Sequence, residues 1–260
     1  MYLEGKVTIV TGGGKGIGRA ISLAFAKEGA DVVVAATTES ALKEAASEIE
    51  AMGKRSLVVV TDLADPKQSL IMVDRTLDKF GRVDVLVNNS GIAGPTVGVA
   101  DMDLNAWQEV QAVNLTGAML CAKHVLKKSM IPHQSGTIIN ISSGSGRRGL
   151  LMRSPYSASK FGMIGLTQCL ALEVGRYGIR VNCIAPGLVE GERIERVFRE
   201  RSRVSGVAYE EVVENATGRI ALGRMVRPEE VAALAVFLAS DQSSGVTGQT
   251  INCCGGLSMD

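Results

Sequence analysis

Short runs of apolar, mostly β-branched residues recur along the chain and alternate with longer segments of mixed polarity. Seven runs have the length of strands, and they span 6–12, 31–36, 56–62, 83–89, 136–142, 179–187 and 249–253. Several of them are apolar at consecutive positions, which is typical of strands covered on both faces. The pattern therefore predicts a parallel sheet buried between two layers.

The mixed segments have lengths and apolar spacings suited to crossover helices. They span 17–28, 39–52, 66–80, 105–130 and 156–176. Strands and helices in alternation predict an α/β fold, a doubly wound Rossmann-type domain of three layers. No linker, repeat or low-complexity tract interrupts the pattern, so we expect one domain over 1–260. The alternation fails at about 188–227, before a helix expected near Pro228, and a substrate lid would lie there.

Composition and charge exclude several classes of function. Hydrophobic residues make up 46% of the chain and charged residues 21%, which is typical of a globular protein. The formal net charge of +1 provides no global field to recruit nucleic acid or an anionic membrane. The first ten residues lack the pattern of a secretory signal, and no apolar stretch approaches the roughly 18 residues of a membrane span. We expect a cytoplasmic protein without nucleic acid or membrane partners.

Cysteine and histidine are too few and too scattered for a metal site. The five cysteines are Cys121, Cys169, Cys183, Cys253 and Cys254. Neither they nor the two histidines, His124 and His133, show the paired spacing of metal ligands. We expect free thiols and no catalytic metal, and we assign no role to the adjacent Cys253 and Cys254.

A glycine-rich turn, "TGGGKGIG" at 11–18, directly follows the first predicted strand and opens a helix. Glycines let backbone N–H groups approach a pyrophosphate, and a helix N-terminus favours its negative charge. The candidate cofactor-binding glycines are Gly12, Gly14, Gly16 and Gly18. The alternative is a tight turn that binds nothing, but the strand before it and the helix after it favour a dinucleotide loop.

The end of the second strand bears on the choice of dinucleotide. An acidic residue there binds the ribose hydroxyls of NAD and repels a 2′-phosphate. This chain has "AATTES", in which Thr37 and Thr38 follow Ala36 and the acid is missing. Lys15 in the glycine turn and the threonine hydroxyls could bind a phosphate. We therefore predict NADP(H) over NAD(H), and the alternative is a solvated Lys15 with weak selectivity.

The heptapeptide "SPYSASK" at 154–160 has two interpretations. Ser154 and Pro155 suit the start of a helix, because serine can cap exposed N–H groups and proline has none. Tyr156 and Lys160 are four residues apart, so on a helix they lie on one face. A phenol beside an ammonium group could transfer protons, but the heptapeptide alone does not decide between the two interpretations.

Taken together, the motifs resemble those of a short-chain dehydrogenase/reductase of about 250 residues, and the resemblance extends over the whole chain. The motifs are "TGGGKGIG", Asp62, "NNSG" at 88–91, Asn114 in "VNLTG", Ser143 in "ISSG", "YSASK" and "PGLVEG" at 186–191. Each is weak by itself, but their order and spacing are specific. The resemblance implies a seven-stranded sheet and hydride transfer between nicotinamide and an alcohol or carbonyl carbon.

The resemblance also implies the catalytic roles. Tyr156 would be the acid/base, and Lys160 would stabilise its phenolate and bind the nicotinamide ribose. Ser143, thirteen residues before the tyrosine, would hold the substrate oxygen. Asn114 would anchor a water relay from Lys160, although its polar side chain could instead end a helix kink.

By position, the resemblance assigns Thr37, Asp62, Leu63 and Asn89 to the adenosine half of the cofactor, with Ile17 and Val189 nearer the nicotinamide half. Three positions depart from the family pattern. Ser90 replaces a usual alanine, and Cys254 stands where an aspartate is frequent. Gly191 stands where a threonine often binds the carboxamide, which puts that contact in doubt.

Arginines are concentrated in the two segments expected to shape the substrate site. They are Arg147, Arg148, Arg153, Arg193, Arg196, Arg199, Arg201 and Arg203. The guanidinium fork suits carboxylate, sulfonate or phosphate, and Arg153 is the best placed because it precedes Tyr156 by three residues. The alternative for 193–203 is an amphipathic helix with a salt-bridged solvent face, since glutamates are interleaved with the arginines.

These features predict a small anionic hydroxy or oxo compound as substrate. A neutral sugar, polyol or cyclic alcohol remains an alternative, as does a 3-oxoacyl thioester. A nucleotide-sensing module without turnover is disfavoured, because both Tyr156 and Lys160 are present. The family commonly forms tetramers through the helices at about 105–130 and 156–176, so we expect a homo-oligomer.

Overall fold

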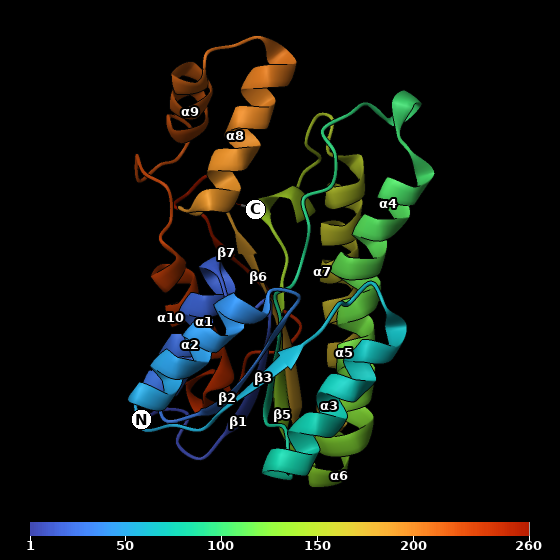
Figure 1. Ribbon diagram of the computed structural model, residues 1–260, viewed down its shortest axis with the longest axis vertical. Helices are drawn as coiled ribbons and strands as arrows, with labels where there is room; N and C mark the ends of the chain where they lie inside the picture. The colour runs from blue at the N-terminus through green and yellow to red at the C-terminus, as the bar shows by residue number, and fades with distance from the viewer. Residues whose placement is uncertain (260) are drawn as a thin grey trace.

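Seven parallel strands form one sheet in the computed structural model, which describes residues 1–259 (Figure 1). The strands are β1 (Val7–Thr11), β2 (Asp31–Ala36), β3 (Ser56–Val60), β4 (Val85–Asn88), β5 (Gly136–Ile141), β6 (Ile179–Pro186) and β7 (Thr250–Cys253). Their order across the sheet is β3-β2-β1-β4-β5-β6-β7. The predicted parallel sheet is therefore confirmed, and each strand lies within the range that its apolar run indicated.

Helices cover both faces of the sheet (Figure 1). One layer contains α1 (Gly16–Lys27), α2 (Glu39–Ala51) and α10 (Pro228–Ala239), and the other contains α3 (Pro66–Phe80), α4 (Leu104–Gln111), α5 (Gly117–Val125), α6 (Ile131–His133) and α7 (Ser154–Val174). Short 3₁₀ turns lie at η1 (Val99–Asp101), η4 (Gly144–Gly146), η5 (Gly175–Tyr177) and η6 (Asp241–Ser243). Each layer has its own apolar core, which explains why the strands are apolar at consecutive positions.

The helix predicted over 105–130 is wound less regularly than its apolar spacing suggests. Two π-helical segments, η2 (Ala112–Thr116) and η3 (Leu126–Met130), interrupt it between α4, α5 and α6. A π turn adds one residue to a helical turn and changes the direction of the side chains that follow. Asn114 lies in the first of these segments, so the irregularity occurs at a predicted site residue.

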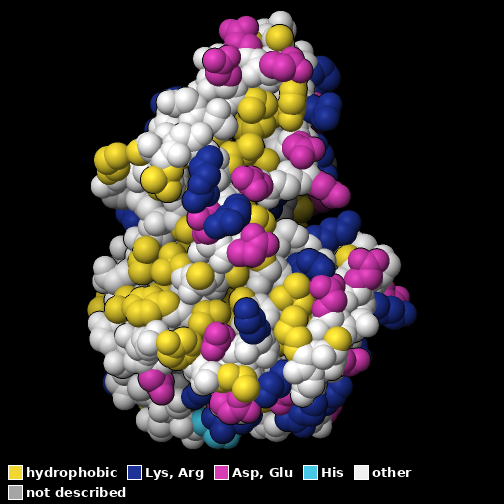
Figure 2. All heavy atoms as spheres, turned by 90° about the vertical axis from the view of Figure 1, so that its left-hand side faces the viewer, with side chains coloured by type: hydrophobic (Ala, Val, Ile, Leu, Met, Phe, Trp, Pro, Cys, Tyr) yellow, Lys and Arg dark blue, Asp and Glu magenta, His cyan; other side chains and the backbone are white. Residues whose placement is uncertain are grey.

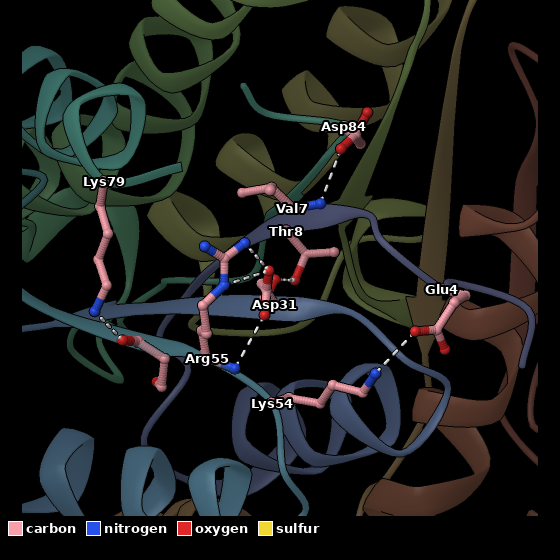
Figure 3. A network of polar contacts seen from close by, with 9 residues as sticks. Glu4, Val7, Thr8, Asp31, Lys54, Arg55, Lys79 and Asp84 are labelled. Atoms are coloured by element: carbon pink, nitrogen blue, oxygen red, sulfur yellow. Dashed lines mark hydrogen bonds and ion pairs between the residues drawn. The ribbon is translucent and has the colours of Figure 1, made fainter. Parts of the chain in front are cut away.

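Ion pairs and hydrogen bonds hold together the edge of the sheet where the first strands begin (Figure 3). Arg55 donates to the carboxylate of Asp31 from its backbone N (2.9 Å), Nε (3.0 Å) and Nη2 (2.5 Å). The Asp84 carboxylate accepts from the backbone N–H of Val7 at 2.8 Å and pairs with Arg82. The charged groups at this edge therefore serve the assembly of the strands.

The 188–227 segment lies above the edge of the sheet where the strands end, and it forms α8 (Glu192–Ser205) and α9 (Tyr209–Thr217) (Figure 1). Figure 2 shows it as an upper lobe with acidic and basic side chains interspersed, above a hollow in the outline of the molecule. Phe198 is the one residue of α8 that is buried, and Val212 is the one residue of α9. Most of this segment therefore faces solvent.

The strand order reverses between β1 and β4, because β2 and β3 extend one way from β1 and β4 to β7 extend the other. In such sheets ligands bind in the crevice at the carboxyl ends of the strands, beside this switch point. The glycine turn after β1 and the residues after β4 and β5 meet there.

No helix formed by residues 1–259 is long and apolar enough to span a membrane.

Candidate active site

Tyr156 and Lys160 lie on one face of α7, as their spacing predicts. Lys160 Nζ is 5.8 Å from the centroid of the Tyr156 ring. The lysine is 3% exposed, and its Nζ donates to the carbonyl oxygen of Ile141, the last residue of β5, at 2.7 Å. This hydrogen bond fixes the ammonium group between the sheet and the phenol.

The start of α7 differs from the prediction that Ser154 caps the helix. Arg153 occupies the N-cap position without a side-chain capping bond, and Ser154 is already the first helical residue. The hydroxyl of Ser154 is buried and has no hydrogen-bond partner in residues 1–259. The prediction was wrong by one residue, because a cap must precede the first helical residue and Pro155 occupies the second position.

Ser143 lies just after β5 and caps the short turn η4. Its Oγ accepts a hydrogen bond from the backbone N–H of Ser145 at 3.1 Å and lies 3.3 Å from the Ser145 hydroxyl. The Ser143 hydroxyl also lies close enough to Tyr156 to lower the pKa of its phenol. The structure therefore brings the predicted serine to the predicted tyrosine, as the spacing of thirteen residues indicated.

Asn114 connects the π-helical segment η2 to the loop after β4. It is fully buried, its Oδ1 accepts from the Ile92 N–H at 2.8 Å, and its Nδ2 donates to the Ile92 carbonyl at 3.0 Å. The same Nδ2 donates to Ser159 Oγ on α7 at 3.0 Å. Asn114 therefore holds the loop against the helix that carries Tyr156 and Lys160.

Positive charges surround the phenol of Tyr156. Burial alone would raise the pKa of this tyrosine, but the nearby Arg193 and Lys160 lower it. The Ser143 hydroxyl and the charge of Arg153 lower the pKa further, so that it lies below that of a free tyrosine. Burial and Arg193 also lower the pKa of Lys160, against the opposite effect of Tyr156.

Arg153 is 8% exposed and lies within the site rather than in solvent. Its Cζ is 5.5 Å from the centroid of the Tyr156 ring, and its Nη1 donates to Thr96 Oγ1 at 3.1 Å and the Gly94 carbonyl at 3.4 Å. The preceding residue, Met152, has a left-handed φ of 59°, which non-glycine residues rarely adopt. Strain of this kind is concentrated at functional sites.

Arg193 reaches the same phenol from α8. Its Cζ is 5.6 Å from the centroid of the Tyr156 ring, and its Nη1 donates to the Gly91 carbonyl at 3.1 Å. Neither Arg153 nor Arg193 forms an ion pair with a carboxylate of residues 1–259. The alternative of a salt-bridged solvent face describes Arg203, which pairs with Glu200, but not Arg193.

The glycine turn has the shape that a pyrophosphate needs. Gly12 and Gly16 have left-handed φ angles of 66° and 49°. A Cβ at Gly18 would lie 2.1 Å from the Gly12 carbonyl oxygen, so only glycine permits this close approach of helix and turn. The N-cap residue of α1, Lys15, makes no side-chain capping bond, which leaves the N–H groups of the first turn directed at the crevice.

The residues predicted to face the adenosine half of the cofactor lie beside this turn. Lys15, Thr37 and Thr38 are exposed, and none of their side chains forms a hydrogen bond within residues 1–259. The Asp62 carboxylate accepts from the Ala64 N–H at 2.9 Å. The side chain of Leu63 packs into an apolar core, so only its backbone can face the crevice.

The remaining predicted contacts line the crevice farther along. Asn89 Nδ2 donates to the Thr11 carbonyl at 2.8 Å and so connects β4 to the start of the glycine turn. Ile17 is partly buried at the start of α1, and Val189 forms an isolated bridge with Val226 at the base of the 188–227 segment. Gly191 has a left-handed φ of 127°, which gives a backbone reason for glycine where the family often has threonine.

Arg193 is the residue that sequence reasoning did not separate from its neighbours. Arg196 and Arg193 lie on the same helix with glutamates beside them, and no local signal distinguishes the two.

All five cysteines are free thiols, and no cluster of potential metal ligands occurs in the part of the chain that the structure describes.

Comparisons with known proteins agree with this geometry. Residues 12–258 match the family described as enoyl-(acyl carrier protein) reductase. The 3-oxoacyl-(acyl-carrier-protein) reductase of Thermotoga maritima is 40% identical over 257 residues, covering 99% of this chain and 99% of that protein. The chain therefore matches its relative from end to end.

Two solved structures are similar in fold and sequence. The crystal structure of NAD⁺-bound xylitol dehydrogenase has a TM-score of 0.95 at 30% identity, covering 98% of this chain and 100% of that one. The crystal structure of an actinorhodin polyketide ketoreductase variant with NADPH has a TM-score of 0.93 at 37% identity, covering 97% of each chain.

Proposed function

This chain belongs to the short-chain dehydrogenase/reductase family, and from that premise we propose that it interconverts an anionic secondary alcohol and the matching ketone with NADP(H). The chain is a nicotinamide-dependent oxidoreductase acting on CH–OH or carbonyl groups. When bound, the nicotinamide supplies or accepts the hydride. The residues of the chain bind the substrate and move the proton.

Tyr156 is the proton donor and acceptor of this proposal. A free phenol has a pKa of about 10 and is a poor base at neutral pH. The charges of Arg193 and Lys160 favour the phenolate and lower the pKa of Tyr156 against the effect of burial. The phenol can therefore accept the proton of an alcohol, or return it to a ketone oxygen in the reverse direction.

The other three catalytic positions support this transfer. The Ser143 hydroxyl, which lowers the pKa of the Tyr156 phenol, would hold the substrate oxygen beside that phenol. Lys160 carries its charge at a position fixed by the Ile141 carbonyl and would bind the nicotinamide ribose. Asn114 holds the loop beside Lys160, and we place there the water relay that would return protons to solvent.

The observation that supports an anionic substrate is the pair of guanidinium groups over Tyr156 without a carboxylate partner. Arg153 and Arg193 lie 5.5 and 5.6 Å from the ring centroid. Arg153 is 8% exposed, and a buried cation is costly unless an anion pairs with it, whereas Arg193 is exposed and adds a second positive charge beside the same ring. A carboxylate, sulfonate or phosphate near the reacting carbon would be that anion, and the 188–227 segment would close over it as a lid.

A second candidate is a 3-oxoacyl thioester, and the relative of 40% identity that reduces such a carrier-bound substrate favours it. A thioester has no charge beside its reacting carbonyl, and an acidic carrier would contact arginines at the entrance of the site instead. The depth of Arg153 favours the small anion, because this arginine lies beside Tyr156 and is nearly enclosed.

The deciding experiment compares initial rates for pairs of alcohols and ketones that differ only in one carboxylate, sulfonate or phosphate. A neutral 3-oxoacyl thioester and a set of sugars, polyols and cyclic alcohols complete the panel. We expect a preference for the charged member of each pair. Arg153→Ala should lower kcat/KM for that member by about 10²-fold, as expected when one partner of a buried charge pair is removed, and should leave the neutral member almost unchanged.

Two outcomes would contradict the anionic substrate. Faster turnover of the thioester, with no effect of Arg153→Ala, would favour the second candidate. Equal or faster turnover of neutral sugars, polyols or cyclic alcohols would mean that the arginines do not select the substrate.

The preference for NADP(H) rests on Lys15, Thr37 and Thr38, which are exposed beside the glycine turn without an acidic residue at the end of β2. A 2′-phosphate there would gain charge-assisted hydrogen bonds. We expect NADPH to bind more tightly than NADH, and Lys15→Ala to weaken NADPH binding while NADH binding stays constant. Equal dissociation constants of the wild-type protein for the two cofactors would contradict this preference.

We also propose that the protein self-associates as a tetramer. Apolar side chains on the helices at about 105–130 and 156–176 are exposed, among them Met119, Phe161 and Leu172. Buried in a contact between copies, they would leave water. Light scattering should give the mass of a tetramer, and a monomeric mass would contradict the proposal.

The five free thiols suit the reducing cytoplasm, where we place the protein.

A further inference from the structure

Arg193 differs from Arg199 and Arg203 of α8 because its side chain contacts residues outside the 188–227 segment. It is exposed, yet its Nη1 reaches 3.1 Å from the Gly91 carbonyl, in the loop after β4, and its Cζ lies over the Tyr156 ring. Arg199 stacks on Tyr209 and Arg203 pairs with Glu200, both within the 188–227 segment. Arg193 is therefore the arginine that joins this segment to the catalytic residues.

The Gly91 backbone lies beside two of the residues assigned to catalysis. A Cβ built at Gly91 would be 3.1 Å from Asn114 Oδ1 and 3.5 Å from Lys160 Nζ. The backbone that Arg193 contacts is thus packed directly against two of the four catalytic positions. A hydrogen bond at this point fixes the guanidinium relative to the phenol as well as relative to the loop.

Charged and polar groups face Tyr156 from three elements. Arg153 and Lys160 come from α7 itself, Arg193 comes from α8, and the Ser143 hydroxyl comes from the turn after β5. The largest effects on the pKa of Tyr156 come from burial, three cations and the Ser143 hydroxyl, and none of them comes from a carboxylate. Because Arg153 and Lys160 share a helix with the phenol, their charges move with it, whereas the charge of Arg193 depends on the position of α8.

Helix α7 is packed more tightly into the protein than helix α8. α7 buries nine of its residues, whereas α8 buries Phe198 alone. Segments with few buried apolar side chains open at lower free energy than well-packed ones. We therefore expect the 188–227 segment to open at lower free energy than α7.

We propose that Arg193 is a positioning residue of the acid/base reaction: it brings a positive charge to the Tyr156 hydroxyl only while the 188–227 segment is closed, so that proton transfer depends on closure. This inference rests on the proposed function of Tyr156. It adds a residue outside the four catalytic positions and gives the segment a role in the chemistry as well as in covering the substrate.

The effects on the pKa of Tyr156 support the proposal. Burial raises that pKa, and Arg193 opposes burial more strongly than Lys160 does. Removal of the charge at 193 should therefore raise the pKa of the phenol. The fraction of phenolate at a given pH then falls, which slows alcohol oxidation on the acidic side of its pH profile and leaves the alkaline plateau unchanged.

The test measures the titration of Tyr156 directly and does not require turnover. Phenolate absorbance is followed against pH, and the curve of the same protein carrying Tyr156→Phe is subtracted. We expect Tyr156 to titrate at higher pH in Arg193→Met and at nearly the wild-type pH in Arg193→Lys. Arg196→Met is the matched control on the same helix, because Arg196 makes no contact with the site in residues 1–259, and it should leave the titration unchanged.

A kinetic measurement complements the titration. With a neutral alcohol, which has no anion for Arg193 to bind, Arg193→Met should lower kcat/KM about 3- to 10-fold on the acidic limb, the effect of one charge at this distance in a solvent-accessible site. An unchanged Tyr156 titration in Arg193→Met would overturn the proposal, and so would an equal loss of rate at every pH. Full activity of Tyr156→Phe would instead overturn the proposed function.

Discussion

Arg55 and the pair Arg153 and Arg193 lie at opposite edges of the sheet and have different partners. At the edge where the strands begin, Arg55 donates to the Asp31 carboxylate from its side chain and its backbone (Figure 3). At the edge where the strands end, Arg153 and Arg193 face a phenol and backbone carbonyls, and no carboxylate of residues 1–259 pairs with them. The same side chain thus serves the fold at one edge and leaves its charge available at the other.

The difference teaches how to separate structural arginines from functional ones. A cation with a carboxylate partner has its charge balanced within the fold. A cation that is buried without such a partner costs stability, and sites that carry this cost are the ones where binding or catalysis requires it. Arg153 combines burial with a missing carboxylate partner beside Tyr156, and this combination supports its proposed role in binding the substrate.

We expect the largest effect from removal of the Tyr156 hydroxyl, the group that the cations of the site surround. Tyr156→Phe removes the hydroxyl and should lower kcat by about 10⁴-fold, the upper range for general acid/base catalysis. Cofactor binding should persist, because the glycine turn is untouched, and fluorescence titration with NADPH would measure it. Tyr177→Phe is the control, since that hydroxyl contacts Arg176 beyond the far end of α7. Retained turnover in Tyr156→Phe would refute the assignment.

An intermediate effect should appear as opposite results in Arg55→Ala and Arg153→Ala. The first variant loses an ion pair whose arginine is largely exposed and should be destabilised by about 0.5–1 kcal/mol with full activity. The second should lose activity on anionic substrates without a lower melting temperature, because it removes a buried cation that faces other cations. Thermal unfolding and initial rates measure both. If Arg153→Ala lowered the melting temperature and Arg55→Ala did not, Arg153 rather than Arg55 would be the arginine that stabilises the fold.

The smallest effect concerns a further paired arginine, Arg224, which holds the carboxylate of Glu230 at 2.7 Å. This hydrogen bond, with that of the Arg227 N–H, lowers the pKa of Glu230 to about 2 in the folded protein. Because the folded pKa lies below that of an unfolded glutamate, the pair stabilises the protein above about pH 4.5 and loses this contribution as the pH falls toward 2.

Melting temperatures measured between pH 6 and pH 3 would test this pair. We expect the acid-induced decrease to be smaller in Glu230→Gln than in the wild type. Glu229→Gln, at the neighbouring position of α10 and without an ion pair in the described residues, should behave like the wild type. An identical acid profile for Glu230→Gln and the wild type would show that the pair does not contribute.

The fold was predictable to within a few residues at most element ends, because parallel strands and crossover helices carry strong apolar patterns. The prediction failed where long-range contacts decide local structure. In the π turn at Asn114, the side chain forms hydrogen bonds to Ile92 and Ser159, which are distant in the sequence. The hydroxyl of Ser154 does not cap α7, because the helix begins at that residue.

The sequence by itself determined the strands, the glycine turn and the pairing of Tyr156 with Lys160, because each depends on spacing within one element. Only the tertiary structure decided which arginines face the phenol. Arg193 and Gly91 are 102 residues apart, and their contact depends on how α8 is oriented over the crevice. Neighbouring arginines on one helix have almost the same local sequence, so only packing against distant segments can distinguish the one that reaches the site.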